Sequence, residues 1–163
     1  MAETKAKKEL NLDEKVTVRN IAGWNVGFSR VADGAIGEVS ITKRGTARLT
    51  RNEIIAQVQN GNKLFLGIDD RGSHATLIIE DTPTRIEVDF ENSDGTLKQN
   101  VFSNDVVKEL FKITNQASFE QRMKDYIRTR AEKYAIIEAI KELKLNDYSK
   151  IRFIENYTGY RIQ

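Results

Sequence analysis

Three short stretches near the N-terminus decide the expected fold: KVTVRN at residues 15–20, WNVGF at 24–28 and EVSIT at 38–42. In each stretch, apolar residues alternate with polar or small ones, and β-branched and aromatic side chains are frequent. This pattern is typical of half-buried strands. Glycines separate the stretches, and Asp33-Gly34 favours a hairpin turn. Short strands at a spacing of roughly ten residues indicate a small β barrel or sandwich.

One helix is expected to interrupt these strands. Thr50 and Glu53 have the spacing of a capping box, and Gly61 can take the left-handed conformation that ends a helix. After this helix, alternating residues predict a hairpin of strands at 63–68 and 75–80, followed by a strand pair at 85–90 and 97–102. The single proline, Pro83, marks a junction before this pair.

From residue 103 onward, apolar residues recur at steps of three and four, as in amphipathic helices. We expect three helices: one capped by Ser103 or Asn104, a long one from Phe119 to about Lys144 after the capping box of Ser118 and Gln121, and one capped by Asn146 or Asp147 that stops near Gly159.

The predicted fold class is therefore α+β. We expect a flexible leader or arm at residues 1–12, a β-rich module at 13–102 consisting of a small barrel or sandwich with one inserted helix, and a C-terminal helical module at 103–163. The leader is polar and rich in lysine, which is typical of a segment that does not fold alone.

Composition excludes several classes of function. The 163 residues include no cysteine and one histidine, so thiolate chemistry and ordinary zinc sites have no ligands. No apolar run is long enough to span a membrane, and the N-terminus does not have the pattern of a secretory signal. No glycine-rich phosphate-binding motif is present, so we predict no cofactor. The net charge of +2 favours no class of partner.

Asp69, Asp70 and His74, with Glu80 and Asp81 nearby, raise the possibility of a metal site or a hydrolase centre. Their spacing matches no calcium-binding loop, and a general base needs a nucleophile and an orienting group within reach. Ser73 adjoins His74, but neighbouring residues of a strand point to opposite faces. We therefore predict neither a metal site nor catalytic residues, and interpret this segment as a solvated hairpin tip.

Charged residues suggest two kinds of partner. Basic residues recur along the long helix, and such a stripe can bind the phosphates of nucleic acid: Arg122, Lys124, Arg128, Arg130 and Lys133. Glu120, Asp125 and Glu132 interleave with them and dilute the positive field. The segment 80–94 is acidic instead, so copies of the chain could pair head to tail as a homo-oligomer or symmetric array.

The order of segments resembles small virion structural proteins that tailed bacteriophages encode near their capsid genes. The segments that carry the resemblance span most of the chain after the leader: KVTVRN (15–20), RNEII (51–55), NKLFLGID (62–69), GSHA (72–75), AEKY (131–134), LNDYSKI (145–151) and ENYTG (155–159). The resemblance implies a head- or neck-associated protein, present in many copies and without enzymatic activity.

Two functional hypotheses follow. The first is a structural protein of the virion, made in the host cytoplasm, that binds capsid or neck proteins. Its leader would dock on the partner through Leu10 and Leu12, while Lys5, Lys7 and Lys8 supply electrostatic attraction. The alternative is a nucleic-acid-binding accessory or regulatory protein that uses the basic stripe.

Overall fold

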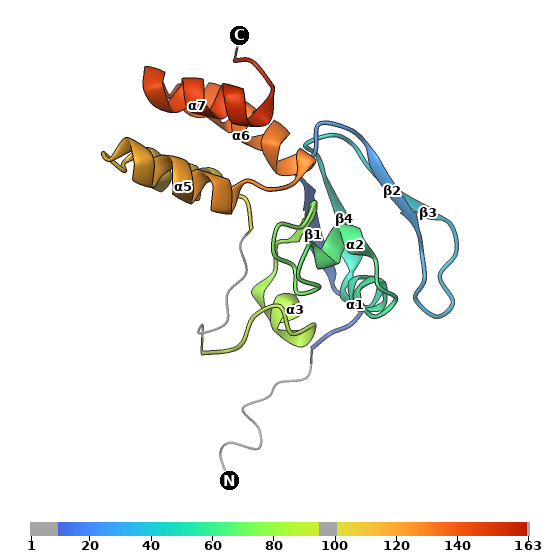
Figure 1. Ribbon diagram of the computed structural model, residues 1–163. Coiled ribbons are helices and arrows are strands. Elements are labelled where there is room, and N and C mark those ends of the chain that lie inside the picture. The colour runs from blue at the N-terminus through green and yellow to red at the C-terminus, as the bar shows by residue number, and fades with distance from the viewer. Residues whose placement is uncertain (1–9, 95–100, 163) are drawn as a thin grey trace.

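The computed structural model describes residues 10–94 and 101–162, and it confirms the α+β fold class. Small antiparallel sheets and short helices form the first part of the chain, and helices alone form the second (Figure 1). The elements in chain order are β1 (Lys15–Asn20), β2 (Val26–Ser29), β3 (Glu38–Ile41), β4 (Thr46–Thr50), α1 (Arg51–Gln59), α2 (Lys63–Leu66), β5 (Leu77–Ile79), α3 (Thr82–Glu87), α4 (Asn104–Phe111), α5 (Gln116–Tyr126), α6 (Arg130–Leu143) and α7 (Tyr148–Thr158).

The described strands form two sheets. In the first, β1 lies between β4 and β5, and Val18 is opposite Ala47 on one side and Ile79 on the other. In the second, β2 pairs with β3, so that Val26 is opposite Ile41. Buried and exposed residues alternate along β1 and β3, which confirms the strand predictions there.

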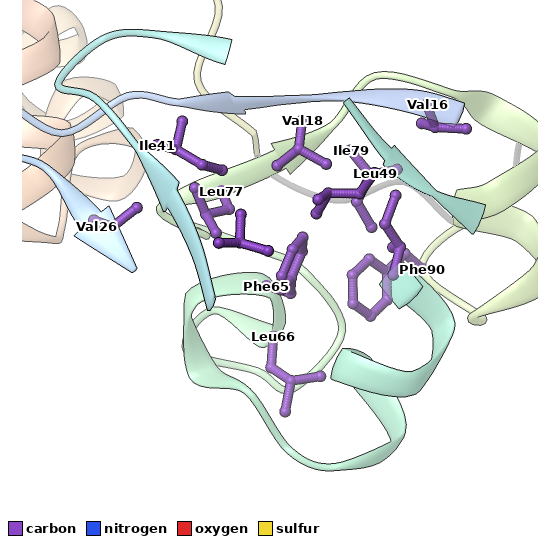
Figure 2. Close-up of a cluster of buried hydrophobic side chains, with 12 residues drawn as sticks. Val16, Val18, Val26, Ile41, Leu49, Phe65, Leu66, Leu77, Ile79 and Phe90 are labelled. Atoms are coloured by element: carbon purple, nitrogen blue, oxygen red, sulfur yellow. The ribbon is translucent and has the colours of Figure 1, made fainter. Parts of the chain in front are cut away.

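Both sheets contribute to one hydrophobic core (Figure 2). The ring of Phe65, from α2, is fully buried among strand side chains and makes an edge-to-face contact with Phe28 at a centroid distance of 5.6 Å. Ile54 from α1 and Phe90 complete the same cluster. Because helix side chains fill the space between two separate sheets, these strands do not close into a barrel.

The expected hairpin of strands at 63–68 and 75–80 is wrong. Residues Lys63–Leu66 form a short helix, whose first turn is capped by the Asn62 side chain through the Leu64 amide at 3.0 Å. The neighbours Phe65 and Leu66 are both buried, which suits a helical turn and not an alternating strand. Residues Leu77–Ile79 are a strand, as predicted, but they pair with β1.

The expected strand at 85–90 is also wrong. Asp81 caps α3 by accepting from the Thr84 amide, and Pro83 occupies the first turn, where its missing N–H costs nothing. The β-rich module therefore contains three helices instead of one. Of the partner strand expected at 97–102, residues 97–100 lie outside the described residues, and 101 and 102 belong to no strand.

In the helical part, α4 begins at one of the two predicted caps, Ser103. Helix α7 begins at Asp147, also one of two predicted caps, and ends at Gly159 as predicted. The expected long helix is instead two helices. Asn115, not Ser118, caps α5, and Thr129 opens α6 with a complete capping box to Glu132. The chain leaves the helical conformation at Ile127, whose backbone is extended, and the Thr129 side chain then caps the start of a new helix.

The helices bury a second apolar cluster, which is separate from the first. Phe119, Met123 and Ile140 are fully buried in it. A third, small cluster joins the two parts: Ile21, Ala22 and Ile78 from the strand region contact Ala131 and Ala135 of α6. We refer to described residues 10–94 as the β module and to 101–162 as the helical module.

Candidate functional site

The junction between the modules contains a buried histidine–glutamate pair. Nδ1 of His74 lies 2.9 Å from Oε2 and 3.0 Å from Oε1 of Glu132, and both side chains are almost completely buried. Glu132 Oε1 also accepts from the amides of Arg128 and Thr129 at the start of α6. An ionised carboxylate only accepts, so Nδ1 of His74 carries the proton in this arrangement.

His74 is therefore a structural contact between modules. Its backbone has a φ of 60°, in the left-handed region. The carboxylates that the sequence placed beside it do not converge on it. Asp69 accepts from the amides of Arg71 and Ser73 in its own turn, and Asp70 pairs with Lys63 at the surface. Among residues 10–94 and 101–162, no three potential metal ligands gather at one point.

A polar cleft of about 450 Å³ lies at the same junction. Arg44 reaches across it to α6 and pairs with Glu142 at 2.5 Å, while Arg19 pairs with Glu80 at 2.5 Å. The hydrogen bond from Arg44 is the main cause of the lowered pKa of Glu142. Of these two ion pairs, Arg44–Glu142 joins the two modules across the cleft, whereas Arg19–Glu80 lies within the β module. All four charged groups in the walls are thus paired with one another.

The loop between β2 and β3, residues 30–37, presents apolar side chains to solvent. Ile36 is 87% exposed and Val31 is 39% exposed. Figure 1 shows that this hairpin extends away from the helical module. The loop is nevertheless ordered, because the Arg30 amide donates to the Gly37 carbonyl at 2.9 Å and the Ala35 amide donates to Ala32 at 2.9 Å.

A buried carboxylate fixes the base of this loop. Glu53 of α1 is 1% exposed and accepts from the amides of Val31 at 2.8 Å and Ala32 at 3.3 Å. Thr50 caps α1 through the Glu53 amide, as predicted, but the Glu53 side chain turns to the loop and not back to the cap. Glu53 has the spacing of a capping box, but its side chain holds the loop at residues 30–37 in place.

Of the residues predicted to dock the leader, Lys5, Lys7 and Lys8 lie outside the described residues. Leu12 is 46% exposed, and Leu10 is partly buried. The buried guanidinium of Arg51 donates to the Asn11 carbonyl at 2.8 Å, and the Asn52 amide donates to the Leu12 carbonyl at 2.9 Å. The body of the protein thus holds residues 11 and 12.

The predicted basic residues do not form one stripe. Arg122 and Lys124 are two residues apart on α5, which places them on nearly opposite sides of that helix. Lys124 and Lys133 lie over two neighbouring rings of α7, Phe153 and Tyr157. Burial is the main cause of the raised pKa of Tyr157, and the Arg128 charge opposes it. Arg130 lies over Trp24, 5.0 Å from the ring centroid.

Part of the acidic segment 80–94 is paired within the chain itself. Glu80 pairs with Arg19, Asp81 with Arg51, and Glu91 with Arg85. Burial alone would raise the pKa of Asp81, but hydrogen bonds from Thr84 and Arg51 lower it overall. These pairs leave less negative charge for a second copy than the sequence suggests.

Comparisons with known protein families, curated proteins and solved structures find no match to this chain. Within residues 10–94 and 101–162, no helix has both the length and the apolar character that crossing a membrane requires.

Proposed function

We propose that this chain is a structural protein of a tailed-phage particle, which binds capsid or neck proteins in many copies and performs no chemistry. The residue pattern that resembles phage virion proteins supports this proposal, and so does one structural feature: the ordered loop at residues 30–37 that holds apolar side chains in water.

The loop has the properties of a preformed docking element. Exposing Ile36 and Val31 is unfavourable for an isolated chain, at about 25 cal/mol for each Å² of apolar surface left in water. The hydrogen bonds that the Val31 and Ala32 amides donate to Glu53 keep the loop in one shape, so binding a partner would cost the loop little conformational entropy. The projecting position of the hairpin makes the loop accessible (Figure 1).

The test replaces Ile36 by Asp in the native source and measures how much chain is recovered with purified particles. We expect I36D to be lost from the particles, because a carboxylate at the tip cannot be buried against a partner without a large desolvation cost. Melting of the free protein should be unchanged, since the Ile36 side chain contacts solvent.

The matched control is I68D, because Ile68 is also an exposed isoleucine of the β module, at 53% exposure, but belongs to a different turn. We expect I68D to enter particles normally. Normal incorporation of I36D, at the wild-type copy number, would contradict the docking role of the loop.

A second variant tests the leader. The structure indicates that truncation should stop before Asn11, because its carbonyl accepts from the buried Arg51. Removal of residues 1–10 takes away Lys5, Lys7, Lys8 and Leu10 and leaves Leu12 in place. We expect this truncated chain to melt like the full chain and to be incorporated poorly; normal incorporation would remove the leader from the proposal.

A further inference from the structure

Four exposed or half-buried cations surround the turn between α5 and α6: Lys124, Arg128, Arg130 and Lys133. We refer to them as the basic surface. None of the four forms an ion pair within the part of the chain that the structure describes, whereas Arg19, Arg44 and Arg51 of the β module all do. The basic surface therefore presents uncompensated positive charge.

One of the acidic residues that the sequence places among these cations is buried in the structure. Glu132 is 1% exposed and faces His74 and the amides that open α6, so its charge is satisfied inside the protein. Asp125 remains exposed on α5, where it accepts from Gln121. The charges of Glu132 and Asp125 still act at this surface, since both oppose the charge of Arg128 at the Tyr157 hydroxyl. The four cations outnumber these two acidic residues, so the net charge of the surface is positive.

The aromatic rings beneath the cations give this surface a fixed form. The rings of Phe153 and Tyr157 are stacked with centroids 5.8 Å apart and planes 8° apart. Nζ of Lys124 is 6.0 Å from the first centroid, and Nζ of Lys133 is 5.1 Å from the second. The Tyr157 hydroxyl donates to the Ile127 carbonyl at 2.7 Å, which ties α7 to the turn.

We propose that the basic surface binds duplex nucleic acid through the phosphate backbone, without reading its sequence. Cations without an ion pair can contact phosphates, and release of the counterions on the nucleic acid would supply the free energy. Lys124 and Lys133 lie over two stacked rings, so these two contacts would be close together. An anionic membrane is the less favoured partner. Membrane binding needs apolar side chains that can insert beside the cations, and the exposed ring of Trp24 is covered by Arg130.

The test measures the affinity of the full chain for a short labelled DNA duplex as salt is raised. Four phosphate contacts predict that affinity falls roughly 150-fold between about 50 and 200 mM salt, because each contact contributes about 0.9 to the logarithmic slope. The variant K124Q/K133Q removes two contacts, so its affinity should fall only about 12-fold over the same range.

The control variant K108Q/K144Q removes the same two charges elsewhere in the helical module, from α4 and from the end of α6. It should keep the wild-type slope. Circular dichroism of both variants checks that the helices persist. Absence of binding at about 50 mM salt, or equal slopes for K124Q/K133Q and the wild type, would overturn the proposal. Binding to vesicles of phosphatidylserine but not to DNA would also overturn it.

Discussion

His74 shows how much a single residue can differ from its appearance in the sequence. As the one histidine beside two aspartates, it invited a catalytic hypothesis, and its position among turn residues favoured exposure. The structure buries it against Glu132, 58 residues away in the chain. No local pattern could predict this pair, because it depends on how the two modules pack.

Replacing His74 by Ala should lower the free energy of unfolding by about 2 to 3 kcal/mol, because the buried Glu132 carboxylate loses a donor. H74N should lose less, since Asn tolerates the left-handed backbone and can place an amide nitrogen near the position of Nδ1. Urea unfolding of the three proteins measures this difference. Identical stabilities for H74A and the wild type would show that the pair does not join the modules.

At the scale of elements, the sequence predicts well where caps and periodicity agree. The strands at 15–20 and 38–41 and the helices α1, α4 and α7 follow from alternation, from helical spacing and from Thr50, Ser103 and Asp147 as caps. Two of the errors fall on short apolar runs, such as Lys63–Leu66, because a run of this length fits a strand as well as a helical turn until the buried residues are known. There the cap at Asn62 and the glycine at 67 decide the conformation.

Gly67 ends α2 in a conformation that other residues rarely adopt. It ends α2 with a φ of 70° and a ψ of −151°, a conformation available almost only to glycine. A methyl group there would collide with the Ser73 carbonyl oxygen. G67A should therefore destabilise the protein by about 3 kcal/mol or more.

Gly61 provides the matched control for this prediction. It also has a positive φ, of 82°, but a methyl group would meet no atom within 4 Å. G61A should cost about 1 kcal/mol, from backbone strain alone. Equal losses for the two variants in thermal unfolding would contradict the tight turn after α2.

For the whole molecule, the sequence predicts the α+β class and the change to helices near residue 102, but not the contacts between modules. Arg44–Glu142 and His74–Glu132 join residues that are distant in the chain, and the small cluster around Ala131 and Ala135 covers the same junction. The residues that meet at the junction of the modules could therefore not be predicted from the sequence. The turn at Asp33-Gly34 and the basic residues of the α5–α6 region could be. The loop extends away from the helical module, to which all four cations of the basic surface belong, so the two proposed contacts would use different parts of the molecule (Figure 1).

The central claim is that the chain belongs to a virion, and sedimentation tests it most directly. A lysate of the native source is treated with nuclease and fractionated, and each fraction is probed for this chain. We predict that the chain travels with large nuclease-resistant particles. Recovery of the chain only in the light fractions would contradict the virion assignment and leave nucleic-acid binding by the basic surface as the remaining function.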